Sequence, residues 1–190
     1  MKRSVKIVLM VMFLSTCLIV GTAEKGFSDD YPILKGLKSI KAVFDFELGN
    51  VQSALLHLQV IQQTFKDNSL RVSNKKPQFV VVFLGPSVKL LSKNRSGFTA
   101  EDQKALDELA NTISQMAKDG IKLEICLIAV KVFGVEPSSI LPEIKQVGNG
   151  WISLIGYQAK GYSLVPLSYT DPSLTETLPS WNNPGIPQGG

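Results

Sequence analysis

The thiol of Cys126 is the side chain in this sequence that is best placed to do chemistry. It ends a strand-like run, residues 121–126, and ligand crevices in α/β sheets open at the carboxyl ends of strands. A helix that began directly after the strand would aim backbone N–H groups at the sulfur and favour its reactive thiolate. Position therefore makes Cys126 the candidate nucleophile.

Cys126 has no cysteine to pair with once the first 23 residues are set aside, because Cys17 lies among them. Such a cysteine is a buried apolar residue, an intermolecular link or a reactive thiol. Residues 127–130 are apolar, and the nearest cation downstream is Lys131. These neighbours favour a buried and inert cysteine, whereas the position at the end of a strand favours a reactive one.

Few other residues could support catalysis. His57 is the only histidine, and it lies at the border of the apolar stripe of a predicted helix, which is typical of a half-buried residue. It can serve Cys126 as a base only if the fold brings the two together. One cysteine, one histidine and no carboxylates at ligand spacing predict no metal site, and we expect no cofactor.

Gly85-Pro86-Ser87 follows an apolar strand and could approach an anion at a helix start. It matches neither of the glycine-spaced fingerprints that bind phosphates. We interpret it as a tight turn that lines the same crevice as Cys126, rather than as a ligand contact.

Apolar periodicity divides the sequence into alternating strands and helices. Gly49-Asn50 ends a β-rich stretch, and Asn50 can cap a helix whose apolar residues recur at three- and four-residue spacing. The predicted elements are strand 39–47, helix 50–66, strand 77–84, helix 99–120, strand 121–126, a short helical segment 129–133, a turn 137–142, strand 144–147, helix 149–158 and strand 162–167. This alternation predicts a three-layer α/β/α domain with a mostly parallel five-stranded sheet.

The strand that carries the cysteine alternates in polarity. One face of the strand is apolar, and the other carries Lys122, Glu124 and Cys126. A parallel strand that is covered on both faces is usually apolar throughout. We therefore expect either an edge strand or a polar face that meets water or another subunit.

Residues 1–23 have the three parts of a secretory signal peptide. Basic residues precede the apolar run 7–20, and Gly21-Thr22-Ala23 supplies small residues at the cleavage site. The run is shorter than the about 20 residues that a membrane span needs. We expect cleavage after Ala23 and a secreted or periplasmic protein without stable membrane insertion, whereas lipidation at Cys17 fits less well.

The mature chain is close to neutral. The signal holds 3 of the 20 lysines and arginines, so 17 basic residues remain against 16 acidic ones, a net charge of +1. This balance gives no reason to expect a nucleic-acid partner. Residues 24–36 form an N-terminal segment, and we expect the Pro- and Gly-rich residues 169–190 to be a disordered tail.

Taken together, residues 37–168 resemble the DsrE/DsrF-like family of sulfur-relay proteins, which has the YchN-like fold. The resemblance rests on the order and spacing of several segments: FVVVFLGPSVKLL at 79–91, DGIKLEIC at 119–126, Gly134-Val135 followed by SILP at 139–142, VGNG at 147–150 and YQAKGY at 157–162.

This resemblance implies a reactive cysteine at Cys126 that carries a persulfide between a donor and an acceptor protein. It also implies a homo-oligomer, either a trimer or a hexamer. Two functions follow as expectations. One is an exported sulfur carrier or sulfurtransferase-like protein that uses Cys126, and the other is a non-catalytic oligomeric binding module of the periplasm with Cys126 in its core.

Overall fold

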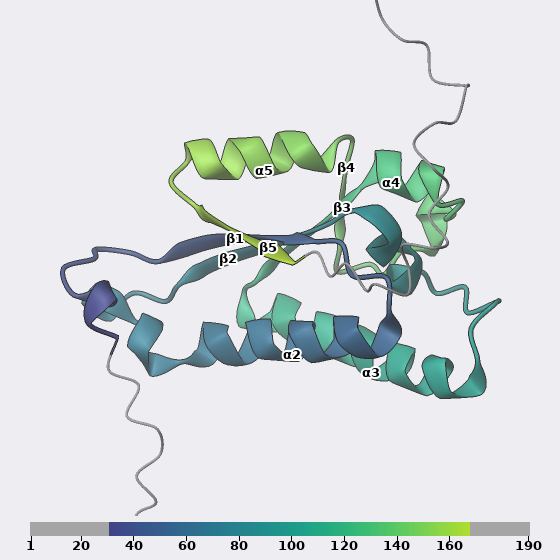
Figure 1. Cartoon of the computed structure of the whole chain (residues 1–190), viewed down its shortest axis with the longest axis horizontal. Helices are drawn as coiled ribbons and strands as arrows, with labels where there is room; N and C mark the ends of the chain where they lie inside the picture. The colour runs from purple at the N-terminus through teal and green to yellow at the C-terminus, as the bar shows by residue number, and fades with distance from the viewer. Residues whose placement is uncertain (1–30, 168–190) are drawn as a thin grey trace, which may run out of the picture. The chain divides into compact units, whose positions relative to one another are not determined.

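A five-stranded sheet forms the centre of the fold, and its strands lie in the order β4-β3-β2-β1-β5 with every neighbouring pair parallel (Figure 1). The computed structural model describes residues 31–167. The strands are β1 (Lys41–Phe46), β2 (Gln78–Phe83), β3 (Lys122–Cys126), β4 (Lys145–Val147) and β5 (Ser163–Leu167). The α-helices are α2 (Val51–Lys66), α3 (Ala100–Asp119), α4 (Leu127–Val132) and α5 (Gly150–Ala159), joined by short 3-10 turns that include η4 (Gly85–Leu91) and η5 (Pro137–Ser139).

The two long helices begin and end where the sequence predicts. The Asn50 side chain accepts a hydrogen bond from the backbone N–H of Ser53 at 2.9 Å, which caps α2. Thr99 caps α3 in the same way, and Gly120 ends that helix with a φ of 101°, a left-handed conformation that suits glycine.

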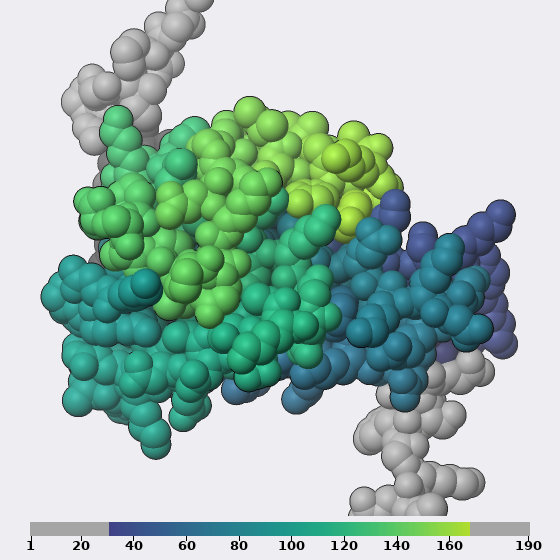
Figure 2. All heavy atoms as spheres, turned by 180° about the vertical axis from the view of Figure 1, so that it is seen from behind, coloured from purple at the N-terminus to yellow at the C-terminus, as the bar shows by residue number. Residues whose placement is uncertain are grey.

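The domain has the predicted three layers. Helices α2 and α3 cover one face of the sheet, and α5 covers the other (Figure 1). From behind, the chain around α4 and α5 gathers on one side and α2 and α3 on the other (Figure 2). The face toward α2 carries interlocking aromatic rings in edge-to-face pairs, namely Phe44–Phe79, Phe46–Phe83 and Phe65–Phe79.

The expectation for the strand that carries Cys126 is wrong in one respect. β3 is not an edge strand, because it pairs with β2 on one side and with the three-residue β4 on the other. Its polar face does not open to water at Glu124, which is only 5 % exposed. The alternation in polarity arises because α5 covers a buried carboxylate and supplies it with a hydrogen-bond partner, the Tyr157 hydroxyl.

Helix α5 buries little of its apolar surface. Leu154 packs against the sheet, whereas Trp151, Ile152 and Ile155 are about two-thirds exposed, at 65 %, 68 % and 65 %. We call these three residues the α5 patch. The neighbouring α4 exposes Ile128 and Val132 as well, so this layer presents an apolar outer surface of a kind that commonly marks an interaction site.

Candidate functional site

Cys126 lies where β3 ends and α4 begins, at the carboxyl edge of the sheet. The residue is only 4 % exposed. Gly150, the first residue of α5, lies directly against it: a Cβ atom at this position would come within 3.0 Å of the Cys126 Cβ and 3.1 Å of the Leu84 Cδ2. The start of α5 therefore packs against Cys126, and the lack of a side chain at Gly150 lets it approach this closely.

The electrostatic surroundings of the thiol are mixed. The amino end of α5, which packs against Cys126, carries the partial positive charge of a helix dipole, and Asn149 caps this end by accepting from the Trp151 N–H at 2.9 Å. Asp45 and Glu47 stand at the carboxyl end of β1, which β2 separates from β3 in the sheet order. Their carboxyl groups bring negative charge to the same edge of the sheet.

Two acidic side chains lie on the sheet face that α5 covers. Asp45 and Glu124 are both register partners of Val82 on the strand between them, so all three point to the same face. The Tyr157 hydroxyl donates to Glu124 Oε1 at 2.9 Å. Within residues 31–167, Asp45 Oδ1 and Glu124 Oε2 are buried and have no hydrogen-bond partner.

Burial changes the proton affinity of this face. It raises the pKa of Asp45. It also raises the pKa of Glu47, with a further contribution from the negative charge of Asp45. Burial raises the pKa of Tyr157, and both the hydrogen bond to Glu124 and the charge of Glu124 act in the same direction. Tyr157 therefore stays protonated and serves Glu124 as a donor.

His57 does not meet Cys126. It lies on α2, which covers the opposite face of the sheet from α5 (Figure 1). Its side chain is half-buried, as predicted, and its Nδ1 lies 2.7 Å from the carbonyl oxygen of Ser53 one turn earlier. A cysteine–histidine pair is therefore excluded in this fold.

The turn Gly85-Pro86-Ser87 has the structural role that the sequence indicates. It opens η4, and Gly85 adopts a φ of 53° close to the Glu47 side chain. The Ser87 hydroxyl is buried and lies 2.7 Å and 3.0 Å from the carbonyl oxygens of Leu84 and Phe46. Its hydrogen bonds tie the ends of β1 and β2 together.

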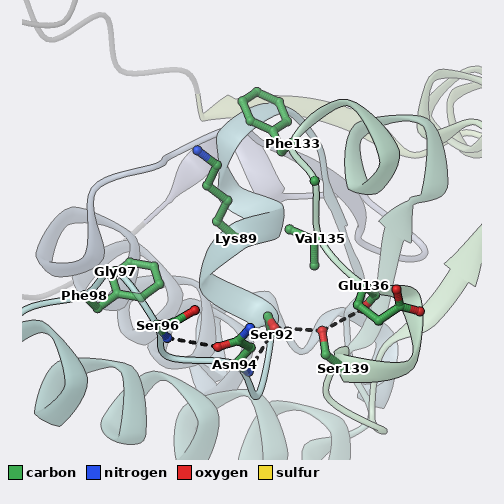
Figure 3. A pocket seen from close by; sticks show the side chains of 11 residues that line it. Lys89, Ser92, Asn94, Ser96, Gly97, Phe98, Phe133, Val135, Glu136 and Ser139 are labelled. Carbon is green, nitrogen blue, oxygen red and sulfur yellow. Dashed lines mark hydrogen bonds between the residues drawn. The ribbon is translucent and has the colours of Figure 1, made fainter.

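A hollow of about 640 Å³ lies between the segment that follows η4 and the segment that follows α4 (Figure 3). The polar groups that line this hollow form hydrogen bonds with one another. Asn94 N–H donates to Ser92 Oγ, which lies 2.7 Å from Ser139 Oγ, and Ser139 Oγ donates to the Glu136 carbonyl at 2.6 Å. This chain of hydrogen bonds joins two loops, so these hydroxyl groups have a structural role.

Residues 31–167 also bear on metal binding and on membrane crossing. No group of three or more His, Cys, Asp or Glu side chains there could hold a metal ion. In the same part of the chain, no helix combines the length and apolarity needed to cross a membrane.

The pair Glu124–Tyr157 is the part of this face that sequence reasoning missed. The signal was present, because Glu124 shares a strand face with Cys126. That face was assigned to water or a subunit contact, since nothing local to β3 indicates that a tyrosine 33 residues later supplies its partner.

Comparison with known proteins places the chain in a family. The model of the DsrE/DsrF-like family matches residues 51–167, more than half of the chain. An uncharacterised protein of Aquifex aeolicus (strain VF5) is 24 % identical over 136 residues, which cover 71 % of this chain but only 59 % of that relative's length.

Two solved structures are similar to the fold. The first, a protein of unknown function, MTH1491 from Methanobacterium thermoautotrophicum, has a TM-score of 0.53 and 14 % identity and covers 68 % of this chain and all of its own. The second, the ychN protein of E. coli, has a TM-score of 0.44 and 10 % identity, over 67 % of this chain and 99 % of its own. The match of the family model over more than half of the chain shows that this chain belongs to the DsrE/DsrF-like family.

Proposed function

We propose that this protein is a sulfur carrier in which the Cys126 thiol accepts and donates sulfane sulfur as a persulfide. The observation that carries the proposal is the place of Cys126 at the carboxyl end of an inner strand, against the amino end of α5. Membership in a family that is generally related to sulfur relay supports the same chemistry.

The transfer step needs only a thiolate and a leaving group. The Cys126 thiolate attacks the outer sulfur of a donor persulfide, R–S–SH. A new S–S bond forms at Cys126, the donor S–S bond breaks, and its electron pair leaves with the donor thiolate R–S⁻. The step consumes no external oxidant or reductant, and delivery to an acceptor thiolate is the same step in reverse.

Access to Cys126 requires local movement. The thiol is nearly covered, and the start of α5 packs directly against it. Short segments that bury few apolar side chains open at a free energy well below that of global unfolding. The first two turns of α5 have this character, since Leu154 is the residue there that packs into the hydrophobic core while Trp151 and Ile152 are exposed.

A second function is favoured by the low exposure of Cys126. With the thiol buried and Gly150 packed directly against it, the cysteine would be an inert core residue. The protein would then be a non-catalytic oligomeric binding module of the periplasm with Cys126 in its core. Reactivity of the native thiol separates this function from the first.

A homo-oligomer, either a trimer or a hexamer, is part of the proposal. Its support is the α5 patch, together with Ile128 and Val132 on α4, because exposed apolar side chains that gather on one layer are commonly covered by a partner. Export through residues 1–23 is likewise proposed, on the order of the charged, apolar and small residues in that segment. Those residues lie outside the described part of the chain.

The test is to treat the folded protein with an inorganic polysulfide and to measure its intact mass. The expected result is the addition of one sulfur atom, which cyanide or dithiothreitol removes and which is absent in Cys126→Ser. A protein with an accessible thiol, added afterwards, should then take up that sulfur from the loaded carrier. No adduct on the folded protein, with full alkylation after unfolding, would favour the binding module.

A further inference from the structure

We infer that the cavity between β3 and α5 binds a small α-amino acid in its zwitterionic form. The cavity has a volume of about 350 Å³ and is lined by residues of β3, α5 and the turn before β5, among them Glu124, Tyr157, Lys122 and Lys160. Its size falls within the range usual for small-molecule sites.

The inner wall of this cavity contains an incompletely partnered carboxylate. Glu124 is 5 % exposed, Tyr157 donates to its Oε1, and its Oε2 is buried without a hydrogen-bond partner among residues 31–167. A buried charged oxygen of this kind is unfavourable unless a donor satisfies it. A ligand ammonium group supplies both the donor and the compensating charge.

The rim of the cavity has the opposite charge. Lys122 and Lys160 are exposed and line the cavity, and neither forms an ion pair within the described residues. Lys145 approaches Glu124 Oε1 only to 3.9 Å, with a side chain that is 75 % exposed. An ammonium group at Glu124 therefore leaves a site for an anion at the two lysines.

The remaining walls are apolar or aromatic. The rings of Tyr157 and Tyr162 pack edge to face with centroids 5.0 Å apart, and the Tyr162 hydroxyl already donates to Gln78. Ile152 lines the same cavity. These walls suit the apolar side chain of an amino acid.

The charge arrangement disfavours simpler ligands. A phosphate or other anion would meet the Glu124 carboxylate, and a simple amine would meet the two lysines without a counter-charge of its own. A zwitterion satisfies both ends. The inference is independent of sulfur transfer, because Cys126 does not line the cavity.

The probe is L-leucine, compared with two analogues that each lack one charge. 4-Methylpentanoate has no ammonium group, and isopentylamine has no carboxylate. Titration calorimetry and amide chemical shifts of the full-length protein are the readouts. We expect leucine to bind and to shift the amides of β3 and α5, with each analogue at least about tenfold weaker, since each leaves one charged group of the site unpaired.

Variants test which side chains bind the ammonium and the carboxylate ends of the ligand. Glu124→Gln keeps an acceptor for Tyr157 and should abolish the preference for leucine over 4-methylpentanoate. The double variant Lys122→Ala/Lys160→Ala should abolish the preference for leucine over isopentylamine. Lys104→Ala, an exposed lysine on α3 behind the sheet, is the matched control.

Cys126→Ser should bind leucine as the natural protein does. Leucine binding and persulfide formation are therefore tested independently of each other. Thermal unfolding verifies that each variant is folded. The inference is overturned if leucine fails to bind at millimolar concentration, or if it binds equally well to folded Glu124→Gln, in which case Glu124 has a structural role only.

Discussion

The two faces of the sheet are built on different principles. The face toward α2 and α3 is apolar and interlocked, with Phe46 and Phe83 fully buried and in edge-to-face contact. The face toward α5 carries Asp45 and Glu124 with buried, unpartnered oxygens, and the helix that covers it exposes most of its own apolar side chains. The face toward α2 and α3 stabilises the fold by apolar packing, whereas the face toward α5 contains buried carboxylates that reduce stability.

This difference explains where chemistry can occur. Parallel sheets gain their stability from apolar strands covered on both faces, and buried carboxylates reduce it unless they are paired. The fold keeps such groups on the face whose cover, α5, is short and lightly packed. Cys126 lies on this face, so the layer that would open in the proposed sulfur transfer is also the layer with the least apolar packing to lose.

The largest predicted effect comes from the aromatic layer. Phe83→Ala should lower the free energy of unfolding by about 3–5 kcal/mol, because it removes a fully buried ring and leaves a cavity beside Phe46. Urea denaturation measures the change. Gln158→Ala, at an exposed position of α5 outside the α5 patch, is the control and should stay within about 0.5 kcal/mol. Equal losses in the two variants would show that the layers do not differ.

The next effect concerns the donor to Glu124. Tyr157→Phe should destabilise the protein by about 1–3 kcal/mol, because it leaves both oxygens of a buried carboxylate without a hydrogen bond. Tyr162→Phe removes a hydroxyl that bonds Gln78, whose side chain is exposed and can bond water instead. Its loss should be smaller in the same denaturation experiment. The reverse order would argue against a strained carboxylate on this face.

Two glycines of α5 differ in the space around them and so test how tightly each part of this helix packs. Gly156→Ala places a methyl group in open space and should stabilise the helix by about 0.5–1 kcal/mol. Gly150→Ala places a methyl group 3.0 Å from the Cys126 Cβ, so steric crowding should cancel or reverse the gain in stability. We expect this variant to be about 1–2 kcal/mol less stable than Gly156→Ala. Melting temperatures of the two variants decide the matter. An equal gain at both positions would mean that the start of α5 does not press on Cys126.

The smallest effect is a dependence on pH. Burial raises the pKa of Asp45 in the folded protein, so the charged form is disfavoured by folding and the protein loses stability as the pH rises through that pKa. Asp45→Asn should therefore be more stable at pH 7, by less than about 1 kcal/mol because the side chain is only partly buried.

That advantage should disappear below about pH 4, where the carboxyl is protonated in the unfolded chain as well. Unfolding curves of both proteins from pH 3 to 8 test the sign. An advantage of Asp45→Asn that grows toward acid pH would contradict the assignment.

Most of the fold could be predicted from the sequence, because its signals are local. Asn50 and Thr99 are side-chain caps that act within three residues, Gly120 supplies its own left-handed turn, and strand β2 is apolar from its second residue to its end. Each of these residues determines structure through its immediate neighbours. The order of elements then leaves few topologies for a parallel sheet.

The site could be predicted only in part, because its contacts are distant along the chain. The position of Cys126 follows from the end of a strand, but its cover, Gly150, lies 24 residues later, and the donor to Glu124 lies in the same helix. Whether a polar residue on a strand meets water or a helix depends on packing that no local pattern specifies. The burial of Glu124 was therefore assigned wrongly, although its orientation was right.

We propose that Cys126 becomes reactive when α5 opens while the rest of the domain stays folded. The direct measurement is the rate of Cys126 alkylation in the native protein at increasing urea concentration, all below the unfolding transition. We predict a rate that depends only weakly on urea and corresponds to an opening free energy well below that of global unfolding. A rate that follows global unfolding throughout, with the same urea dependence and the same free energy, would contradict the account.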